Sequence, residues 1–314
     1  MSLATTVVSI LLNGLQQGSI YVLLAVGLSI ILGTLEFVNF AHGALYIVGA
    51  YFGLYVAGTL TLSEGYLSSW GFSSLGLEAG FLLALVAVIV VVFLLGLLME
   101  RFVTRAFYDR PDTDQILVTF GLAIVVQESL RLLFGSSSQS FAQPIQGSVP
   151  IEGVATTWWR IAVIGITAVL VLGVYLLIEY TDFGLVVRAG TEDAEMVRLL
   201  GIRITRPYVV VFGIGAALAG VAGVVGGPLN PINPTAGTDI LVPAFVTVVI
   251  GGVGSIRGAV LGGVTLGLIQ SFFIQTSIGT YNLAPWAQVA IYAMAAVILL
   301  WRPQGIMGEE VSTA

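Results

Sequence analysis

The chain has 314 residues, of which 57% are hydrophobic and 9% are charged, and its mean hydropathy is +1.03. Soluble domains carry about 25% charged residues, so 11 basic and 17 acidic side chains are too few to coat a soluble fold of this size. The chain has no Lys, no Cys and a single His, His42. These absences exclude a P-loop ATPase site, Schiff-base cofactors such as retinal, cysteine-ligated metals and multi-histidine metal sites. We therefore expect a membrane protein without a cofactor.

A membrane-spanning helix needs about 20 mostly apolar residues, and nine segments of the chain meet or approach that length. They cover residues 5–35, 44–62, 79–98, 115–134, 158–178, 207–227, 240–256, 259–278 and 285–300. The first is long enough to be tilted or broken. The pattern predicts an all-α polytopic membrane protein with roughly 8–10 transmembrane helices, forming a single transmembrane domain over residues 1–314.

The positions of the Arg residues predict the orientation in the membrane. Eight lie in the loops after the third and fifth segments and in the tail: Arg101, Arg105, Arg110, Arg188, Arg198, Arg203, Arg206 and Arg302. The loops at 63–78, 135–157, 228–238 and 279–284 contain none. Because basic loops stay cytoplasmic, we expect a cytoplasmic carboxyl terminus. The amino terminus is outside if the first two segments both cross fully, and inside if residues 36–43 are re-entrant. The sequence leaves both open.

The longest charged stretch is the cytoplasmic loop at residues 181–206. Residues 190–201 predict one short helix, with Thr191 as its N-cap, acidic residues in its first turn and Gly201 as its C-terminal stop. Its apolar stripe is Met196, Val197, Leu199 and Leu200, and its polar face is Glu192, Asp193, Glu195 and Arg198. Such a helix suits a groove on a cytosolic partner. The alternative is a helix lying on the lipid surface, although such helices are usually basic.

Several uncharged polar residues and glycines lie within or between the apolar segments. Asn39 and His42 precede Gly43, and Gln16 lies in the first segment. Polar groups at membrane depth either line a wet path or form hydrogen bonds between helices. Glycines that are four residues apart allow close helix packing. Alternatively, they leave room for a pore. Within the fourth segment, Glu128 and Arg131 lie one turn apart and can neutralise each other.

Five motifs in order resemble the LivH-type permease subunit of branched-chain amino acid ABC importers. They are Asn39-Phe40-Ala41-His42-Gly43 with Tyr46 and Gly49-Ala50-Tyr51, then Thr119-Phe120-Gly121-Leu122 with Gln127, then Arg188-Ala189 through Leu199-Leu200-Gly201-Ile202, then Gly251-Gly252-Val253-Gly254-Ser255-Ile256 with residues 258–263, and finally Arg302-Pro303-Gln304-Gly305. The resemblance covers the length of the chain. It implies the ABC importer permease fold in the cell membrane (plasma or inner membrane) of a prokaryote.

The resemblance also implies partners and sites. The partners would be a second, LivM-type permease, two cytosolic ATPase subunits, an external substrate-binding protein and membrane lipid, with no nucleic acid. The ATPase-coupling residues would be Arg188, Thr191, Glu192, Asp193, Glu195, Met196, Val197, Leu200 and Gly201. From the polar residues and glycines themselves, we expect the substrate path to include Gln16, Asn39, His42, Tyr46, Gly251, Gly252 and Gly254. The chain itself would be no enzyme, because ATP would be hydrolysed on the separate subunits.

Two alternatives remain. Permeases for urea or short amides share much of the pattern. A stand-alone secondary transporter or channel belongs to another class, but we detect neither an acid cluster at mid-membrane nor an inverted repeat in the sequence. A membrane enzyme would need a nucleophile–base pair, which we do not find. Finally, Arg in place of every Lys, a formal charge of −6 and a pI near 4.7 suggest a halophilic origin as a hypothesis.

Overall fold

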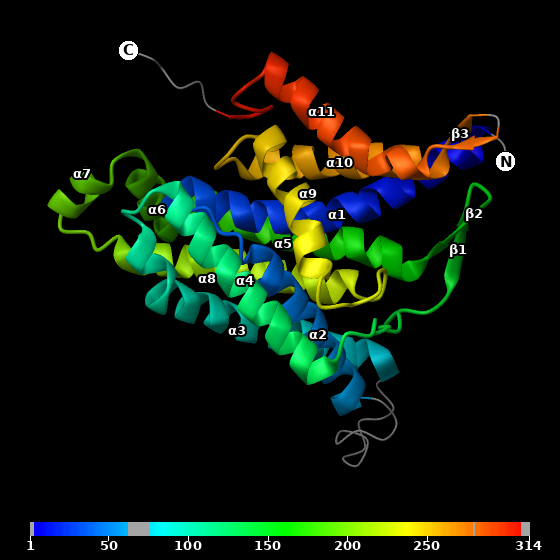
Figure 1. The fold of residues 1–314 in the computed structure, drawn as a ribbon, viewed down its shortest axis with the longest axis horizontal. Coiled ribbons are helices and arrows are strands. Elements are labelled where there is room, and N and C mark those ends of the chain that lie inside the picture. Colours follow the sequence, from blue (N-terminus) through cyan, green and yellow to red (C-terminus); the bar gives the residue numbers. More distant parts are fainter. Residues whose placement is uncertain (1–2, 62–75, 279, 309–314) are drawn as a thin grey trace.

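The computed structural model describes residues 3–61, 76–278 and 280–308, and within these ranges the fold is a bundle of long helices (Figure 1). The long helices are α1 (Leu3–Leu35), α2 (His42–Thr61), α3 (Gly76–Phe102), α4 (Asp112–Phe134), α5 (Trp158–Tyr180), α8 (Thr205–Gly226), α9 (Ala236–Gly251), α10 (Ile256–Gln275) and α11 (Ala287–Trp301). Each coincides with one predicted apolar segment. Seven helices in the described ranges are long and apolar enough to cross a membrane, so the all-α polytopic class is confirmed.

The short elements mark the two ends of the bundle. They are the helices α6 (Asp182–Glu192) and α7 (Ala194–Leu199), the 3₁₀ turns η3 (Thr104–Phe107) and η4 (Ala284–Trp286), and two antiparallel hairpins, β1 (Ser148–Ile151) with β2 (Val154–Thr157) and β3 (Ser277–Ile278) with β4 (Tyr281–Asn282). The hairpins lie near the amino terminus at one end of the long axis, whereas α6 and α7 lie at the other end (Figure 1). The predicted Arg-rich loop therefore lies opposite the amino terminus.

Glycines let the central helices touch each other. A Cβ atom added at Gly267 of α10 would overlap the backbone of Gly14 and Gly18 in α1, and one added at Gly263 would overlap Val22. Close approach of this kind lets dispersion hold helices together where lipid removes the hydrophobic driving force. At these positions the packing interpretation of the glycine spacing is confirmed.

The chain re-enters the bundle after α1. Glu36 takes a left-handed conformation with φ of 48°, and residues 36–41 lead back to α2. At the start of α2, Nε2 of His42 lies 3.1 Å from the carbonyl oxygen of Leu24. At 1.5 Å per residue, Leu24 is about 16 Å from the end of α1 at Leu35. Residues 36–43 are therefore re-entrant. Because α1 nevertheless runs the full length of the bundle, its amino end lies opposite the Arg-rich end, and the expected link between a re-entrant segment and an inside amino terminus does not hold.

The second half of the chain repeats this arrangement upside down. Helix α8 runs antiparallel to α1, since Gly226 lies beside Ile20 while Gly215 lies beside Gly27. Helices α1, α2, α3 and α4 correspond in order to α8, α9, α10 and α11. The contacts match: α1 packs on α10 as α8 packs on α3, and α4 packs on α2 as α11 packs on α9. The two re-entrant helices meet at Gly43 and Gly237, where a Cβ on either glycine would overlap the carbonyl oxygen of the other. The structure thus contains an inverted repeat of α1–α4 and α8–α11, which we did not detect in the sequence.

Candidate coupling and translocation sites

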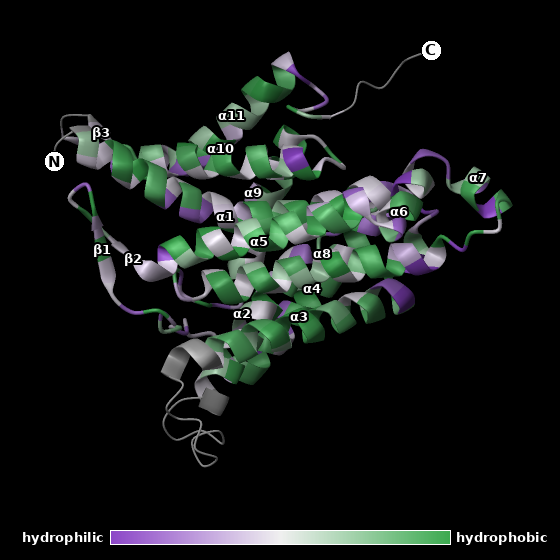
Figure 2. Cartoon of the chain, turned by 180° about the vertical axis from the view of Figure 1, so that it is seen from behind, coloured by the Kyte–Doolittle hydropathy of each residue, from purple (hydrophilic) through white to green (hydrophobic). Residues whose placement is uncertain are grey.

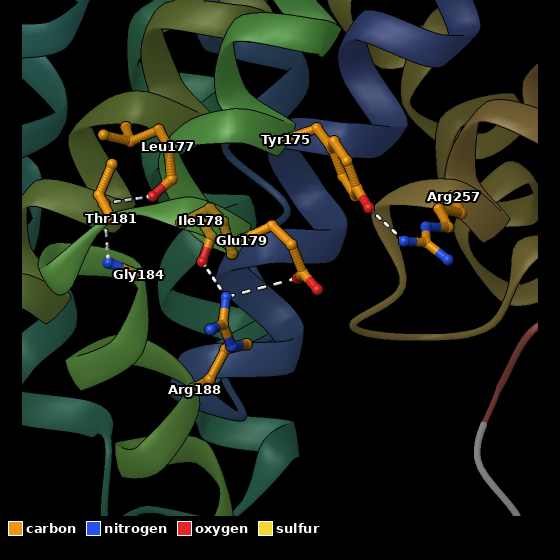
Figure 3. Close-up of polar contacts among 8 residues, drawn as sticks. All are labelled: Tyr175, Leu177, Ile178, Glu179, Thr181, Gly184, Arg188 and Arg257. Carbon is orange, nitrogen blue, oxygen red and sulfur yellow. Dashed lines mark hydrogen bonds and ion pairs between the residues drawn. The ribbon is translucent and has the colours of Figure 1, made fainter.

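The junction between α5 and α6 is tightly fastened (Figure 3). The hydroxyl of Thr181 accepts a hydrogen bond from the amide of Gly184 at 3.2 Å and donates one to the carbonyl of Leu177 at 2.5 Å. A Cβ on Gly184 would overlap the carbonyl oxygen of Ile178. Thr181 therefore caps α6, and only glycine at 184 lets α6 fold back against the end of α5.

Two Arg side chains reinforce this junction (Figure 3). The guanidinium of Arg188 donates to the carbonyl oxygen of Ile178 and pairs with the Glu179 carboxylate at 3.4 Å. The guanidinium of Arg257, in the first turn of α10, donates to the hydroxyl of Tyr175 and lies 5.1 Å from its ring centroid. The cytoplasmic end of α5, as predicted from the Arg distribution, is thus bound to both α6 and α10.

The predicted single helix over residues 190–201 is wrong, because the chain forms two helices with a break at Asp193. Thr191 lies in the last turn of α6, where its hydroxyl donates to the carbonyl of Val187 at 2.9 Å. Asp193 leaves the helical conformation, and its carboxylate accepts from the amide of Met196 at 2.8 Å. A carboxylate is the stronger N-cap because it also interacts with the positive helix end. Gly201, with φ of 81°, ends the segment as predicted.

The break divides the apolar stripe. Val197 points inward and is 5% exposed, whereas Met196, Leu199 and Leu200 are 53%, 75% and 71% exposed. We call these three side chains the α7 stripe. Met196 and Leu199 lie on α7 and Leu200 directly follows it, and this short helix projects furthest from the bundle (Figures 1 and 2). Large apolar side chains grouped at such a tip are typical of a docking surface.

A polar cavity of about 710 Å³ separates α6 and α7 from the ends of α1, α3, α4 and α8. Its ionisable lining residues are Glu36, Glu100, Arg105, Tyr108, Asp109, Arg110, Asp112, Glu192, Asp193, Arg198 and Tyr208. Three of the coupling residues predicted from the resemblance, Thr191, Glu192 and Asp193, therefore face this cavity. On its far wall, the hydroxyl of Tyr208 in α8 donates to the carbonyl of Gly190 at 2.8 Å and so ties α6 to α8.

A buried carboxylate that we did not predict, that of Glu100, lies on the cavity wall. Arg105 donates to it at 2.7 Å and the Tyr108 hydroxyl at 3.1 Å. Burial first, and then the charge of Glu100, raise the pKa of the Tyr108 phenol, while the hydrogen bond to Glu100 raises the pKa of Arg105. This cluster holds η3 against α3. The sequence did contain a sign of this ion pair, because Glu100 ends an apolar segment and Arg105 follows five residues later.

The residues predicted for the substrate path lie at helix contacts. Gln16, Asn39, His42 and Tyr46 are buried. Gly251 contacts Gly258, Gly252 contacts Gly308, and Gly254 contacts Gly33. The Nδ2 atom of Asn39 and the Nδ1 atom of His42 are buried without a hydrogen-bond partner in the described part of the chain. Neither residue lines the cavity beside α6 or the crevice between α2, α4 and α9.

Helix α4 supports the re-entrant segment. The side chain of Gln115 accepts from the amide of Val38 at 3.0 Å, and the hydroxyl of Thr119 accepts from the amide of Phe40 at 3.0 Å. Non-helical backbone at membrane depth needs such partners, because no water satisfies it there. Thr119 belongs to one of the motifs that resemble the permease family, and its role in this structure is to support the backbone of the re-entrant segment.

A narrow crevice lies where α2, α4 and α9 meet. Its polar lining groups are Gln127 of α4 and Thr238 of α9, and the Thr238 hydroxyl donates to the side-chain Oε1 atom of Gln127 at 3.2 Å. Phe40 and Phe120 supply aromatic walls. The crevice holds about 10 Å³ of free volume, enough for roughly one water molecule.

Residues 10–300 match the family described as branched-chain amino acid transport system / permease component. The chain belongs to this permease family. It is 32% identical to the high-affinity branched-chain amino acid transport system permease protein BraD of Pseudomonas aeruginosa, over 95% of both chains. It is 31% identical to LivH of Salmonella typhimurium (95% and 94% covered) and 26% identical to the probable LivH of Methanocaldococcus jannaschii (96% and 92% covered). No solved structure matches the permease.

Proposed function

We propose that this permease is one of two membrane subunits of an ATP-driven importer of branched-chain amino acids in the cell membrane of a prokaryote. Family membership and the names of the BraD and LivH relatives support the substrate class. The absence of any Lys rules out a P-loop in this chain, so the energy comes from separate cytosolic ATPase subunits. A second, LivM-type permease and an external binding protein complete the complex.

The observation that carries this proposal is the α7 stripe, three exposed apolar side chains at the Arg-rich end. The ATPase subunit buries Met196, Leu199 and Leu200 in a groove on its surface. Since basic loops are cytoplasmic, this end faces the cytosol. The carboxyl-terminal segment also lies there, because Met307 donates to the carbonyl of Gly251, close to the Gly254–Gly33 contact.

Coupling then follows from the fastened junction. When the ATPase moves α7, the Asp193 cap transmits the displacement to α6. Arg188 carries it to the end of α5, and Tyr208 carries it to α8. The remaining predicted residues, Thr191, Glu192, Glu195, Val197 and Gly201, shape the same segment. Helix α8 lies in the centre of the bundle, so this route connects the tip to the helices that would open the path.

Solute passes between this chain and the second permease, and the external binding protein selects it. Gln16, Asn39, His42, Tyr46, Gly251 and Gly252 are buried, whereas Gly254 is exposed in the turn between α9 and α10. All seven remain our prediction for residues of the path, and the six buried ones reach solute only when the helices separate during transport.

Co-purification with the ATPase subunits tests the proposal. We expect a stable complex whose ATP hydrolysis rises when the external binding protein delivers leucine, and not when it is offered urea or acetamide. A permease that purifies without ATPase partners, or ATP hydrolysis that responds to amides instead of leucine, would overturn the proposal.

A further inference from the structure

We propose that the exposed face of α4 and α9 is the wall of the solute path, with Asp239 as its fixed negative charge for the ammonium group of the amino acid. This inference rests on the proposed import function. It names a surface and a residue that lie outside the predicted path set, and it assigns the opposite faces of α3 and α5 to lipid.

The first step is the depth of the start of α9. Ser9 contacts Gln275 and Gly33 contacts Gly254, so these pairs mark the two ends of the α1–α10 pair. The helix between Ser9 and Gly33 is about 36 Å long, which with a tilt spans a hydrocarbon layer of about 30 Å. Leu24 is about 14 Å from Gly33 and about 22 Å from Ser9 along this helix.

His42 lies beside Leu24, and the adjacent Gly43 contacts Gly237 in the first turn of α9. The start of α9 is therefore close to the middle of the membrane. Thr238 and Asp239, the next two residues, are exposed on the surface of the chain at that depth.

The second step is the polarity of this face. The side chain of Thr238 forms a hydrogen bond with the side chain of Gln127 in α4. The next residue of α4, Glu128, forms an ion pair with Arg131, with 3.1 Å between the carboxylate and the guanidinium. Both side chains of the pair are nearly half exposed. The carboxylate of Asp239 has no ion pair or side-chain hydrogen bond among the described residues. Exposed groups of this kind need water or a polar partner, since a carboxylate at the centre of a lipid-exposed helix costs about 2.5–3.5 kcal/mol.

The third step is the contrast with the other side of the bundle. Every exposed side chain in the middle of α3 and α5 is apolar, including Leu82, Val86 and Val90 of α3 and Val169 and Leu172 of α5. From behind, these two helices are hydrophobic along most of their length (Figure 2). Helix α4 also exposes the apolar side chains of Leu117, Ile124 and Val125, so the contrast lies in the polar strip beside them, which is made of Gln127, Glu128, Arg131, Thr238 and Asp239. We assign α3 and α5 to lipid and this strip to an aqueous path.

The chemistry of the strip fits a zwitterion with an apolar side chain. The carboxylate of Asp239 attracts an ammonium group and repels anionic solutes. Phe40 and Phe120 line the adjoining crevice and offer apolar surface to a branched side chain. At a separation of about 6 Å in water, one fixed charge changes the local concentration of a monovalent ion about threefold.

Because the chain contains no Cys, single cysteines test this assignment in the complete importer in liposomes, with the wild-type chain as background. We expect membrane-impermeant methanethiosulfonates to label Thr238→Cys and Val242→Cys, which lie one turn apart, and leucine delivery to slow the labelling. The matched controls Val169→Cys and Leu172→Cys on α5 should stay unlabelled. Equal labelling on α5 and α9 would overturn the proposal.

The charge is tested with cationic and anionic versions of the reagent. Relative to the rates of the same two reagents with a small free thiol, the cationic reagent should be favoured about tenfold at Thr238→Cys. Asp239→Asn should abolish that extra preference while Asp239→Glu retains it. Asp239→Asn should also raise KM for leucine more than it lowers kcat. An unchanged reagent preference would refute the role of Asp239. Uptake of leucine by the wild-type complex with ATP is measured in parallel. If that uptake occurs, an unchanged reagent preference refutes the path assignment alone and leaves the importer function intact.

Discussion

Shortening Leu200 to Ala should weaken assembly of the permease with its ATPase. The substitution removes three carbon groups, which at about 0.8 kcal/mol each are worth about 2.4 kcal/mol when fully buried. Leu200 is 71% exposed in the chain alone, so the ATPase can bury at most that share, about 1.7 kcal/mol. The dissociation constant of the permease–ATPase complex should rise about 15- to 20-fold.

The assay is titration of the purified ATPase onto the detergent-solubilised permease, followed by fluorescence anisotropy of labelled ATPase. Leu172→Ala, at an exposed leucine in the middle of α5, is the matched control and should change the dissociation constant by less than about twofold. If Leu200→Ala behaves like Leu172→Ala, the α7 stripe does not dock on the ATPase. A helix that lies on lipid would give that result.

Three further predictions concern the fold and its setting. Asp193→Ala should destabilise α7 by about 1 kcal/mol through loss of the N-cap and should lower leucine-stimulated ATP hydrolysis. Thr191→Ala should have a smaller effect on both quantities. Equal effects of the two substitutions would contradict the observed helix break at Asp193. Gly237→Ala should strongly reduce the yield of folded permease in size-exclusion chromatography, because its Cβ would overlap the carbonyl of Gly43, whereas Gly121→Ala, where a Cβ meets open space, should fold normally. If the halophilic origin is right, the complex should stay assembled and active at molar salt, and a complex that is intact only at low salt would contradict it.

The helices could be predicted because each requires only a local property, an apolar stretch of about 20 residues. Gly201 was predictable for the same reason, since a left-handed residue after a helix is usually glycine. The break at Asp193 was missed because Thr191 and Asp193 are both good caps. In the fold, Gly190 packs on Tyr208 of α8 and Val187 is buried. Both contacts belong to α6 and depend on tertiary packing, so they could not be predicted from this segment alone.

The relative placement of the helices could not be predicted. Gln115 and Thr119 support backbone amides nearly 80 positions away in the sequence, and nothing local to either partner reveals that pairing. The inverted repeat was not visible in the sequence because the two halves share a packing pattern but have opposite orientations and different residues. Asn39-Phe40-Ala41-His42 leads into α2, whereas Pro231-Ile232-Asn233-Pro234 leads toward α9. The matching helix contacts of the two halves and the Gly43–Gly237 contact reveal the correspondence.

The most direct test of the central claim is leucine uptake into liposomes that contain this permease, its second permease and the ATPase subunits, with binding protein outside. We predict uptake against a concentration gradient that requires ATP inside and stops when the ATPase subunits are omitted or when Met196, Leu199 and Leu200 are all replaced by Ser. Leucine accumulation by the permease alone, driven by an ion gradient, would contradict the account.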